Sequence, residues 1–102
     1  MKFYAEKIGV TYGRITIRNQ KTRWGSCAAN GNLNFNCLLM ATPVEVIDSV
    51  VVHELCHRRH MNHSKEFYGE IYRVYPDYDK WNKWLKDNGG LLIKRMLAAY
   101  SG

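Results

Sequence analysis

The fold is decided by residues 50–67, which read VVVHELCHRRHMNHSKEF. At their centre lie His53 and His57, four residues apart, with Glu54 between them. A helix advances about 1.5 Å and about 100° per residue, so side chains four residues apart lie one turn above each other on one face. We therefore predict a helix that points both imidazole rings at one position, with a carboxylate beside them.

This arrangement is the HExxH motif, which is typical of zinc hydrolases. A catalytic zinc ion has three protein ligands and leaves its fourth position to water. Glu54 can then act as the general base toward that water. The alternative is a structural histidine pair. The metal is favoured because unpaired ionisable groups on a buried helix are unfavourable, and the residues before the motif are mostly apolar: Val44, Val46, Ile47, Val50, Val51 and Val52.

The motif supplies two ligands, so a third must come from elsewhere in the chain. His63 follows His53 by ten residues, the separation found in the longer HExxHxxGxxH signature. That signature has glycine at its turn, and here Met61-Asn62 is expected to supply the turn, because asparagine tolerates the left-handed conformation. The alternatives are a glutamate of the next helix, as in His₂Glu sites, or the histidine about 10 Å further along the helix axis: Glu66, Glu70 or His60.

Length and composition indicate one folded domain that covers residues 1–102. Hydrophobic residues make up 46% of the chain, and no apolar run approaches the ~20 residues that a membrane helix needs. The first residues, MKFYAEKIG, lack the apolar segment of a signal peptide, so a cytoplasmic location is expected. Three cysteines, an odd number, favour reduced thiols, with Cys56 in the core and Cys27 and Cys37 as structural residues.

Positive charge is concentrated in the first part of the chain, and the whole chain has a net charge of +6. Residues 1–44 hold six basic side chains against one acidic one, whereas residues 45–102 hold nine against eight. A basic segment favours acidic partners, so one prediction is contact with nucleic acid or a nucleotide through residues 2–23. The alternative is a solvated face that keeps the protein soluble.

Two patterns predict a small antiparallel sheet of about three strands. Residues 14–18, RITIR, alternate basic and apolar side chains, which predicts a strand with Ile15 and Ile17 facing the core. Residues 22–27 and 33–37 are predicted to form a hairpin, because Asn30-Gly31 between them is the favoured pair for a tight type I′ turn.

Helices are predicted on either side of the motif. Residues 3–9 fit one or two helical turns before a glycine. The main helix is expected from about 43 to 59, with Thr42 as its cap and Glu45 completing a capping box. A second helix is expected to start near Ser64 and stop at Pro76. A third is expected to start near Asp77 and to end before Gly89, with residues 91–100 again helical; the fold class is α+β.

Several separated motifs together resemble the YgjP-like metallopeptidase family, which is related to SprT-like zinc proteases. They are KTRWGSC at 21–27, the Asn-Gly hairpin, residues 41–68 and PDYDKWNKWLKDNG at 76–89. The resemblance implies a zincin-like fold, in which a small sheet packs on the active-site helix. It also implies one zinc ion bound by His53, His57 and His63, with Glu54 as the catalytic acid and base. Family members are usually longer at the amino terminus, so this chain is expected to be the carboxy-terminal catalytic part or a short relative.

A zinc metallopeptidase that cleaves peptide or protein substrates is therefore the favoured function. The alternatives are a metal-dependent hydrolase of nucleotide phosphoanhydrides and a zinc-containing module that binds nucleic acid or a DNA-bound protein. In a peptidase, an edge strand can hold the substrate by pairing with it, and we expect residues 22–27 to do so, with Trp24 either at a subsite or in the core. The candidates for stabilising the oxyanion are Arg23, Tyr68 and Tyr72.

Overall fold

The computed structural model describes residues 2–18 and 23–101, which form an α+β fold as predicted. Within these residues the elements follow in the order α1 (Lys2–Ile8), β1 (Ile15–Arg18), β2 (Gly25–Cys27), β3 (Leu33–Asn36), the 3₁₀ helix η1 (Cys37–Ala41), α2 (Val44–Cys56), α3 (Lys65–Val74) and α4 (Tyr78–Ser101). The first predicted helix, residues 3–9, corresponds to α1, and its buried residues are Ala5 and Ile8.

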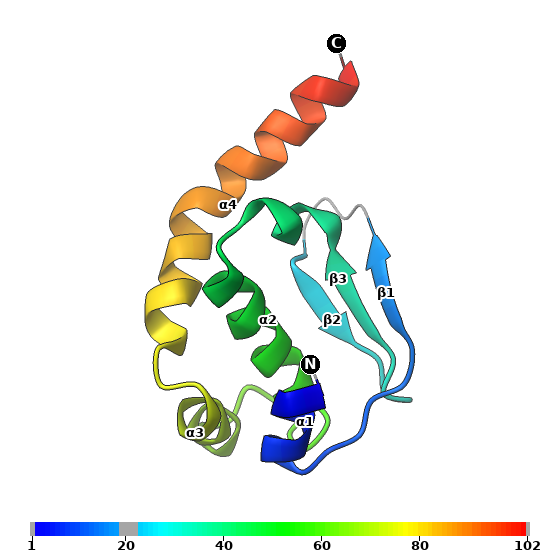
Figure 1. Ribbon diagram of the computed structural model, residues 1–102, viewed down its shortest axis with the longest axis vertical. Helices are drawn as coiled ribbons and strands as arrows, with labels where there is room; N and C mark the ends of the chain where they lie inside the picture. The colour runs from blue at the N-terminus through cyan, green and yellow to red at the C-terminus, as the bar shows by residue number, and fades with distance from the viewer. Residues whose placement is uncertain (1, 19–22, 102) are drawn as a thin grey trace.

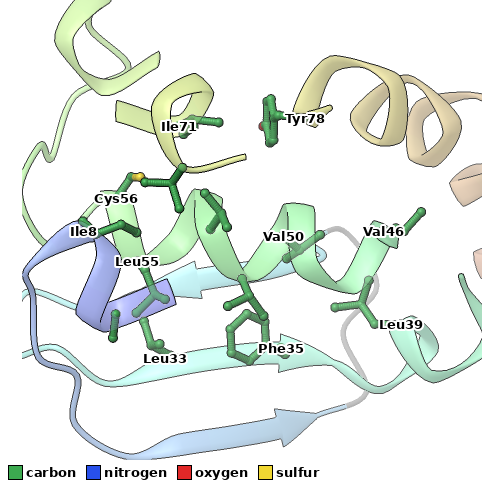
Figure 2. Packing of buried hydrophobic residues seen from close by; sticks show 14 of the residues in the cluster. Ile8, Leu33, Phe35, Leu39, Val46, Val50, Leu55, Cys56, Ile71 and Tyr78 are labelled. Carbon is green, nitrogen blue, oxygen red and sulfur yellow. The ribbon is translucent and has the colours of Figure 1, made fainter. Parts of the chain in front are cut away.

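Helix α2 lies at the centre, between the sheet on one side and α3 and α4 on the other (Figure 1). Its sequence is apolar around most of its circumference, so it can be buried on all these sides. Figure 2 shows side chains from the surrounding elements that pack against it. Leu33 and Phe35 come from β3, Ile71 comes from α3, and Tyr78 comes from α4. The site motif is therefore built on the most buried helix of the fold.

The ends of α2 differ from the prediction. Pro43 is the N-cap and Thr42 does not cap the helix; the Thr42 hydroxyl donates to the Leu39 carbonyl at 2.7 Å, within η1. The predicted capping box is therefore wrong, because the Thr42 hydroxyl bonds to a carbonyl of the preceding 3₁₀ helix and not to a backbone N–H of α2. At the other end the helix stops at Cys56, and residues 57–59 form a tighter turn with bonds to residues three positions back.

The sheet is mixed, with strand order β1-β3-β2. The hairpin partners β2 and β3 are antiparallel as predicted, but β1 pairs in parallel with the other side of β3, so an all-antiparallel sheet was wrong. The alternation of apolar residues defines the faces of a strand, but it carries no information on which strand lies next to it or in which direction. The predicted arm at 22–27 contains the strand at its end; Thr22 lies outside the described residues.

The hairpin turn is a three-residue loop, Ala29–Gly31, in place of the predicted type I′ turn. The Ala28 carbonyl accepts from Gly31 N–H at 2.9 Å, and Ala28 N–H donates to the Asn32 carbonyl at 2.9 Å. A type I′ turn needs positive φ at two successive residues. Gly31 has φ of 93°, but no described residue other than glycine has positive φ. One left-handed glycine after a right-handed turn closes this hairpin.

Strand β1 does not bury its isoleucines as predicted. Ile15 is 40% exposed and Ile17 is 56% exposed. The physical reason is the strand order: β1 is the edge strand on the far side of the sheet from α2, which contacts β2 (Figure 1). Between β1 and α2 a hollow of about 130 Å³ remains, which we call the apolar hollow; its walls are Ile15, Ile17, Phe35, Asn36, Leu39, Met40, Ile47 and Val51.

Helices α3 and α4 begin near the predicted positions. The Ser64 hydroxyl accepts from Phe67 N–H at 3.2 Å and caps α3. Helix α4 does not end before Gly89 but continues to Ser101, and its second half extends beyond the rest of the fold (Figure 1). Gly89 is buried because the Trp24 ring lies against it: a Cβ there would be 2.6 Å from a ring carbon. Close packing against Trp24 therefore explains why residue 89 is a glycine. Among the described helices, none has the length and apolar composition needed to cross a bilayer.

Candidate active site

Three histidines converge on one position. His53 lies in the last turn of α2, His57 is its C-cap residue, and His63 lies in the segment that leads into α3. One ring nitrogen of each lies within 4.8 Å of those of the other two. The ring centroids are 4.8 to 5.3 Å apart. Such a group of imidazole nitrogens suits a zinc ion.

Hydrogen bonds leave the same nitrogen of two rings free. His53 Nδ1 lies 2.9 Å from the Tyr78 hydroxyl, and His57 Nδ1 lies 3.2 Å from the His60 carbonyl. A carbonyl can only accept, so His57 carries its hydrogen on Nδ1 and has a lone pair on Nε2. Burial is the main cause that lowers the pKa of His53 to about 4 and also lowers the pKa of His57. Both rings are thus neutral at pH 7, as metal binding requires.

Glu54 is the one acidic side chain among the buried residues described, with 5% of its surface exposed. Its side chain lies against β2: a Cβ at Gly25 would be 3.1 Å from Glu54 Cγ and 3.2 Å from Oε2. Burial raises the pKa of Glu54 to about 7, and the guanidinium of Arg23 opposes that shift. A carboxyl with a pKa near neutrality can both accept and release a proton at physiological pH.

The other candidates for a third metal ligand do not join the two histidines of the motif. Glu70 accepts hydrogen bonds from Arg73, with Oε1 2.5 Å from its Nη2, and this contact lowers the pKa of Glu70. Glu66 is exposed in the first turn of α3. His60 meets His57 through its backbone carbonyl. Among the described residues, the group of side chains able to share one metal ion consists of His53, His57 and His63.

The chain returns to the site without a left-handed residue. Met61 and Asn62 form a bend between the turn after α2 and the start of α3. Met61-Asn62 therefore supplies a bend as predicted, but not through a left-handed Asn62, because glycines alone have positive φ among the described residues. The tighter turn at residues 57–59 has already redirected the chain, so an ordinary bend is sufficient to bring His63 back.

Two cavities flank Glu54. One, the Tyr78 cavity, has a volume of about 220 Å³ and is lined by residues of α2, of α4 and of the segment that leads into β2. The other, the His63 cavity, has a volume of about 350 Å³ and extends past the three histidines to Cys27 and Met61. The two cavities share four lining residues, which lie at the middle of the cleft: Arg23, Gly25, His53 and Glu54. A substrate that fills both cavities would pass directly over Glu54.

The three candidates for the oxyanion lie in different environments. Arg23 lines both cavities. The Tyr68 ring stacks on His63 with 6.3 Å between centroids. The Tyr72 hydroxyl donates to Asp79 at 2.8 Å and is engaged there. Trp24 is half-buried: it packs on Gly89 and also lines the Tyr78 cavity.

The three cysteines are free thiols. Cys56 is buried with no exposed surface, as expected of a core residue, and burial raises its pKa to about 12. Cys27 lines the His63 cavity, but burial and the nearby Glu54 carboxylate raise the pKa of its thiol. A neutral thiol is a poor metal ligand.

Sequence reasoning missed two residues of this site. Tyr78 belongs to the PDY motif that contributed to the resemblance, but its role as the partner of His53 has no local signal, because the two are 25 positions apart. Gly25 in the WGSC motif is the second. A glycine inside a predicted strand is a signal of close backbone approach, and this signal could have placed Glu54 against it.

Comparisons with known proteins identify the family of the chain and a similar fold. A family model described as "YgjP-like, metallopeptidase domain" matches residues 1–88. The chain is similar in fold to the crystal structure of the metallopeptidase zymogen of Pyrococcus abyssi abylysin, with a TM-score of 0.74 and 17% identity, over 84% of this chain and 89% of that chain. No curated protein matches the chain. Because the family model covers most of its length, the chain belongs to the YgjP-like metallopeptidase family.

Proposed function

We propose that this metallopeptidase domain binds one zinc ion through His53, His57 and His63 and hydrolyses peptide bonds with Glu54 as the general base. The observation that carries the proposal is the convergence of three ring nitrogens within 4.8 Å, with a buried carboxylate one residue from the first of them. Bound zinc would supply two effects, a lower pKa for a water molecule and polarisation of the substrate carbonyl.

The protein side chains have separate roles in this reaction. Glu54 accepts the proton of the attacking water and then donates it to the leaving amine. Its pKa of about 7 in the metal-free protein suits both transfers, since neither protonation state is strongly favoured. Arg23 and Tyr68 are the candidates that remain free to stabilise the oxyanion, because Arg23 lines the cleft and Tyr68 lies against His63.

The substrate is proposed to lie along β2. This strand forms the edge of the sheet that is next to α2, and its residues Gly25–Cys27 line the His63 cavity. An extended peptide added to this edge would gain backbone hydrogen bonds independent of its sequence, and it would cross the cleft beside Glu54. Unfolded segments of proteins are therefore the expected substrate class.

Glu54→Gln is the direct test of the proposed chemistry. The amide cannot accept the proton, so hydrolysis of an unfolded protein should fall at least about 100-fold. Zinc content should stay at one ion per chain, because Glu54 is not a ligand. Cleavage is measured by gel electrophoresis and mass spectrometry, and metal by atomic emission. The exposed Glu66→Gln serves as the matched control and should retain full activity.

Unchanged hydrolysis by Glu54→Gln would remove Glu54 from the mechanism. The family match favours a peptidase over the nucleotide hydrolase and the nucleic-acid module that composition left open. Release of phosphate from nucleoside triphosphates, without cleavage of protein, would reverse that preference. A reducing compartment such as the cytoplasm is the proposed location, supported by the three free thiols.

A further inference from the structure

We propose that Tyr78 is a positioning residue, whose hydroxyl oxygen holds His53 in the tautomer and ring orientation that leave Nε2 free for the metal. The inference rests on the proposed zinc site. Tyr78 is the first residue of α4, it is 5% exposed, and its hydroxyl lies 2.9 Å from His53 Nδ1. The two rings are nearly parallel, with an angle of 21° between their planes.

The direction of this hydrogen bond decides whether His53 can bind a metal. A neutral imidazole carries one N–H, on either Nδ1 or Nε2. When Nδ1 carries the hydrogen, it donates to the tyrosine oxygen and Nε2 keeps a lone pair. In the other tautomer the hydrogen lies on Nε2, so that nitrogen has no lone pair for zinc. A hydroxyl can donate or accept, and the form in which the Tyr78 oxygen accepts from Nδ1–H is the one that leaves His53 able to bind the metal.

The surroundings of His53 make that acceptor important. The Phe67 ring packs edge-on against His53 with 5.1 Å between centroids, and Phe67 is fully buried. An Nδ1–H without a partner would be left next to apolar groups, which is unfavourable. His57 does not share this dependence, because its Nδ1 faces a backbone carbonyl that side-chain substitution cannot remove. Among the described residues, Tyr78 is the one whose side chain hydrogen-bonds a histidine of the triad.

Tyr78 also ties the site to α4. His53 and Tyr78 are 25 residues apart, and α4 packs on α2 beside the Tyr78 cavity. The position of the first turn of α4 thus determines where the hydroxyl lies. If Tyr78 only filled space in the core, a phenylalanine would serve equally well. Removal of the hydroxyl therefore distinguishes a packing role from a positioning role.

The test compares Tyr78→Phe with Tyr75→Phe, each of which removes one hydroxyl. Tyr75 is the matched control because its hydroxyl donates to the Glu45 carbonyl at 2.9 Å, away from the histidines. Zinc affinity is measured by competition with a chromophoric chelator. Tyr78→Phe should bind zinc about 10- to 100-fold more weakly than the unaltered protein, whereas Tyr75→Phe should change affinity less than about twofold. Thermal unfolding of the metal-free proteins checks that both variants are folded.

A second readout reports the tautomer of His53 directly. Two-bond ¹H–¹⁵N spectra of the metal-free protein should show His53 with its hydrogen on Nδ1, and Tyr78→Phe should shift it toward Nε2. Hydrogen on Nε2 in the unaltered protein, or equal zinc affinity in Tyr78→Phe, would overturn the inference while the metal site stands. An unaltered protein that binds no zinc would overturn the proposed function and this inference together.

Discussion

Helix α2 has two kinds of space beside it, and they are built differently. The cleft formed by the Tyr78 and His63 cavities is lined by histidines, a glutamate and an arginine, and hydrogen bonds hold two of its histidine rings. The apolar hollow on the β1 side is lined mainly by aliphatic and aromatic side chains. On the hollow side, α2 is stabilised by the packing of apolar side chains. On the cleft side, the proposed function depends on where individual side-chain atoms lie. Substitutions on the two sides should therefore affect different properties.

The largest expected effect is on stability, from the hollow side. Phe35 is 6% exposed and packs between β3 and α2 (Figure 2). Phe35→Ala should lower the free energy of unfolding by about 3 to 5 kcal/mol, because the lost side chain enlarges a hollow that is already present. Urea unfolding of the metal-free protein measures it. A loss below about 1 kcal/mol would mean that the surrounding chain closes over the space, and the contrast between the two sides would be wrong.

The next effect depends on pH and comes from the cleft side. In the metal-free protein burial raises the pKa of Glu54 from 4.5 to about 7, so the folded state disfavours the carboxylate. This cost is absent below pH 4.5 and grows as the pH rises to 7. Glu54→Gln should therefore be more stable than the unaltered protein by about 2 kcal/mol at pH 8, and the difference should vanish near pH 4.

Denaturant unfolding at the two pH values measures this difference. The lowered pKa of His53 removes stability as the pH falls from 6.5 toward 4, but it does so in both proteins and largely cancels. A stability difference that is independent of pH would show that Glu54 is an ordinary solvated carboxylate. Glu54 would then not lie in the buried environment that the structure shows.

The smallest effect tests how closely the cleft side is packed. A Cβ at Gly25 would lie 3.1 Å from both Val50 Cγ1 and Glu54 Cγ. Gly25→Ala should shift Glu54 by a few tenths of an ångström and lower kcat about tenfold, with zinc content unchanged. Gly69→Ala is the matched control, since nothing lies within 4 Å of its Cβ position. Full activity of Gly25→Ala would show that Glu54 tolerates displacement.

The local chemistry of this fold could be predicted from the sequence, whereas its long-range arrangement could not. The spacing of His53, Glu54 and His57 requires only a helix, and Ser64 identifies the start of α3 by its own side chain. The exposure of Ile17 follows from β1 being an edge strand, which no pattern within β1 reveals. Likewise, Gly89 does not end α4 but packs against Trp24, a residue far away in the chain.

In the candidate site, too, the local features could be predicted from the sequence and the long-range contacts could not. The motif predicted its two histidines and the carboxylate beside them, and the ten-residue separation favoured His63 over the glutamates. The partner of Glu70 is Arg73, a contact within α3 that sequence spacing allows but does not require. Tyr78 could not be predicted, because its contact with His53 depends on how α4 docks. The contact that is proposed to position His53 therefore depends on tertiary structure, whereas the spacing of the histidines can be read from the sequence.

The zinc content of the purified protein and of two single variants tests the account most directly. Atomic emission should find one zinc ion per chain in the unaltered protein and in Glu70→Ala, and almost none in His63→Ala after dialysis against a chelator. Circular dichroism confirms that each variant is folded. A His63→Ala protein that keeps a full zinc ion, or a Glu70→Ala protein that loses it, would contradict a site made by three histidines.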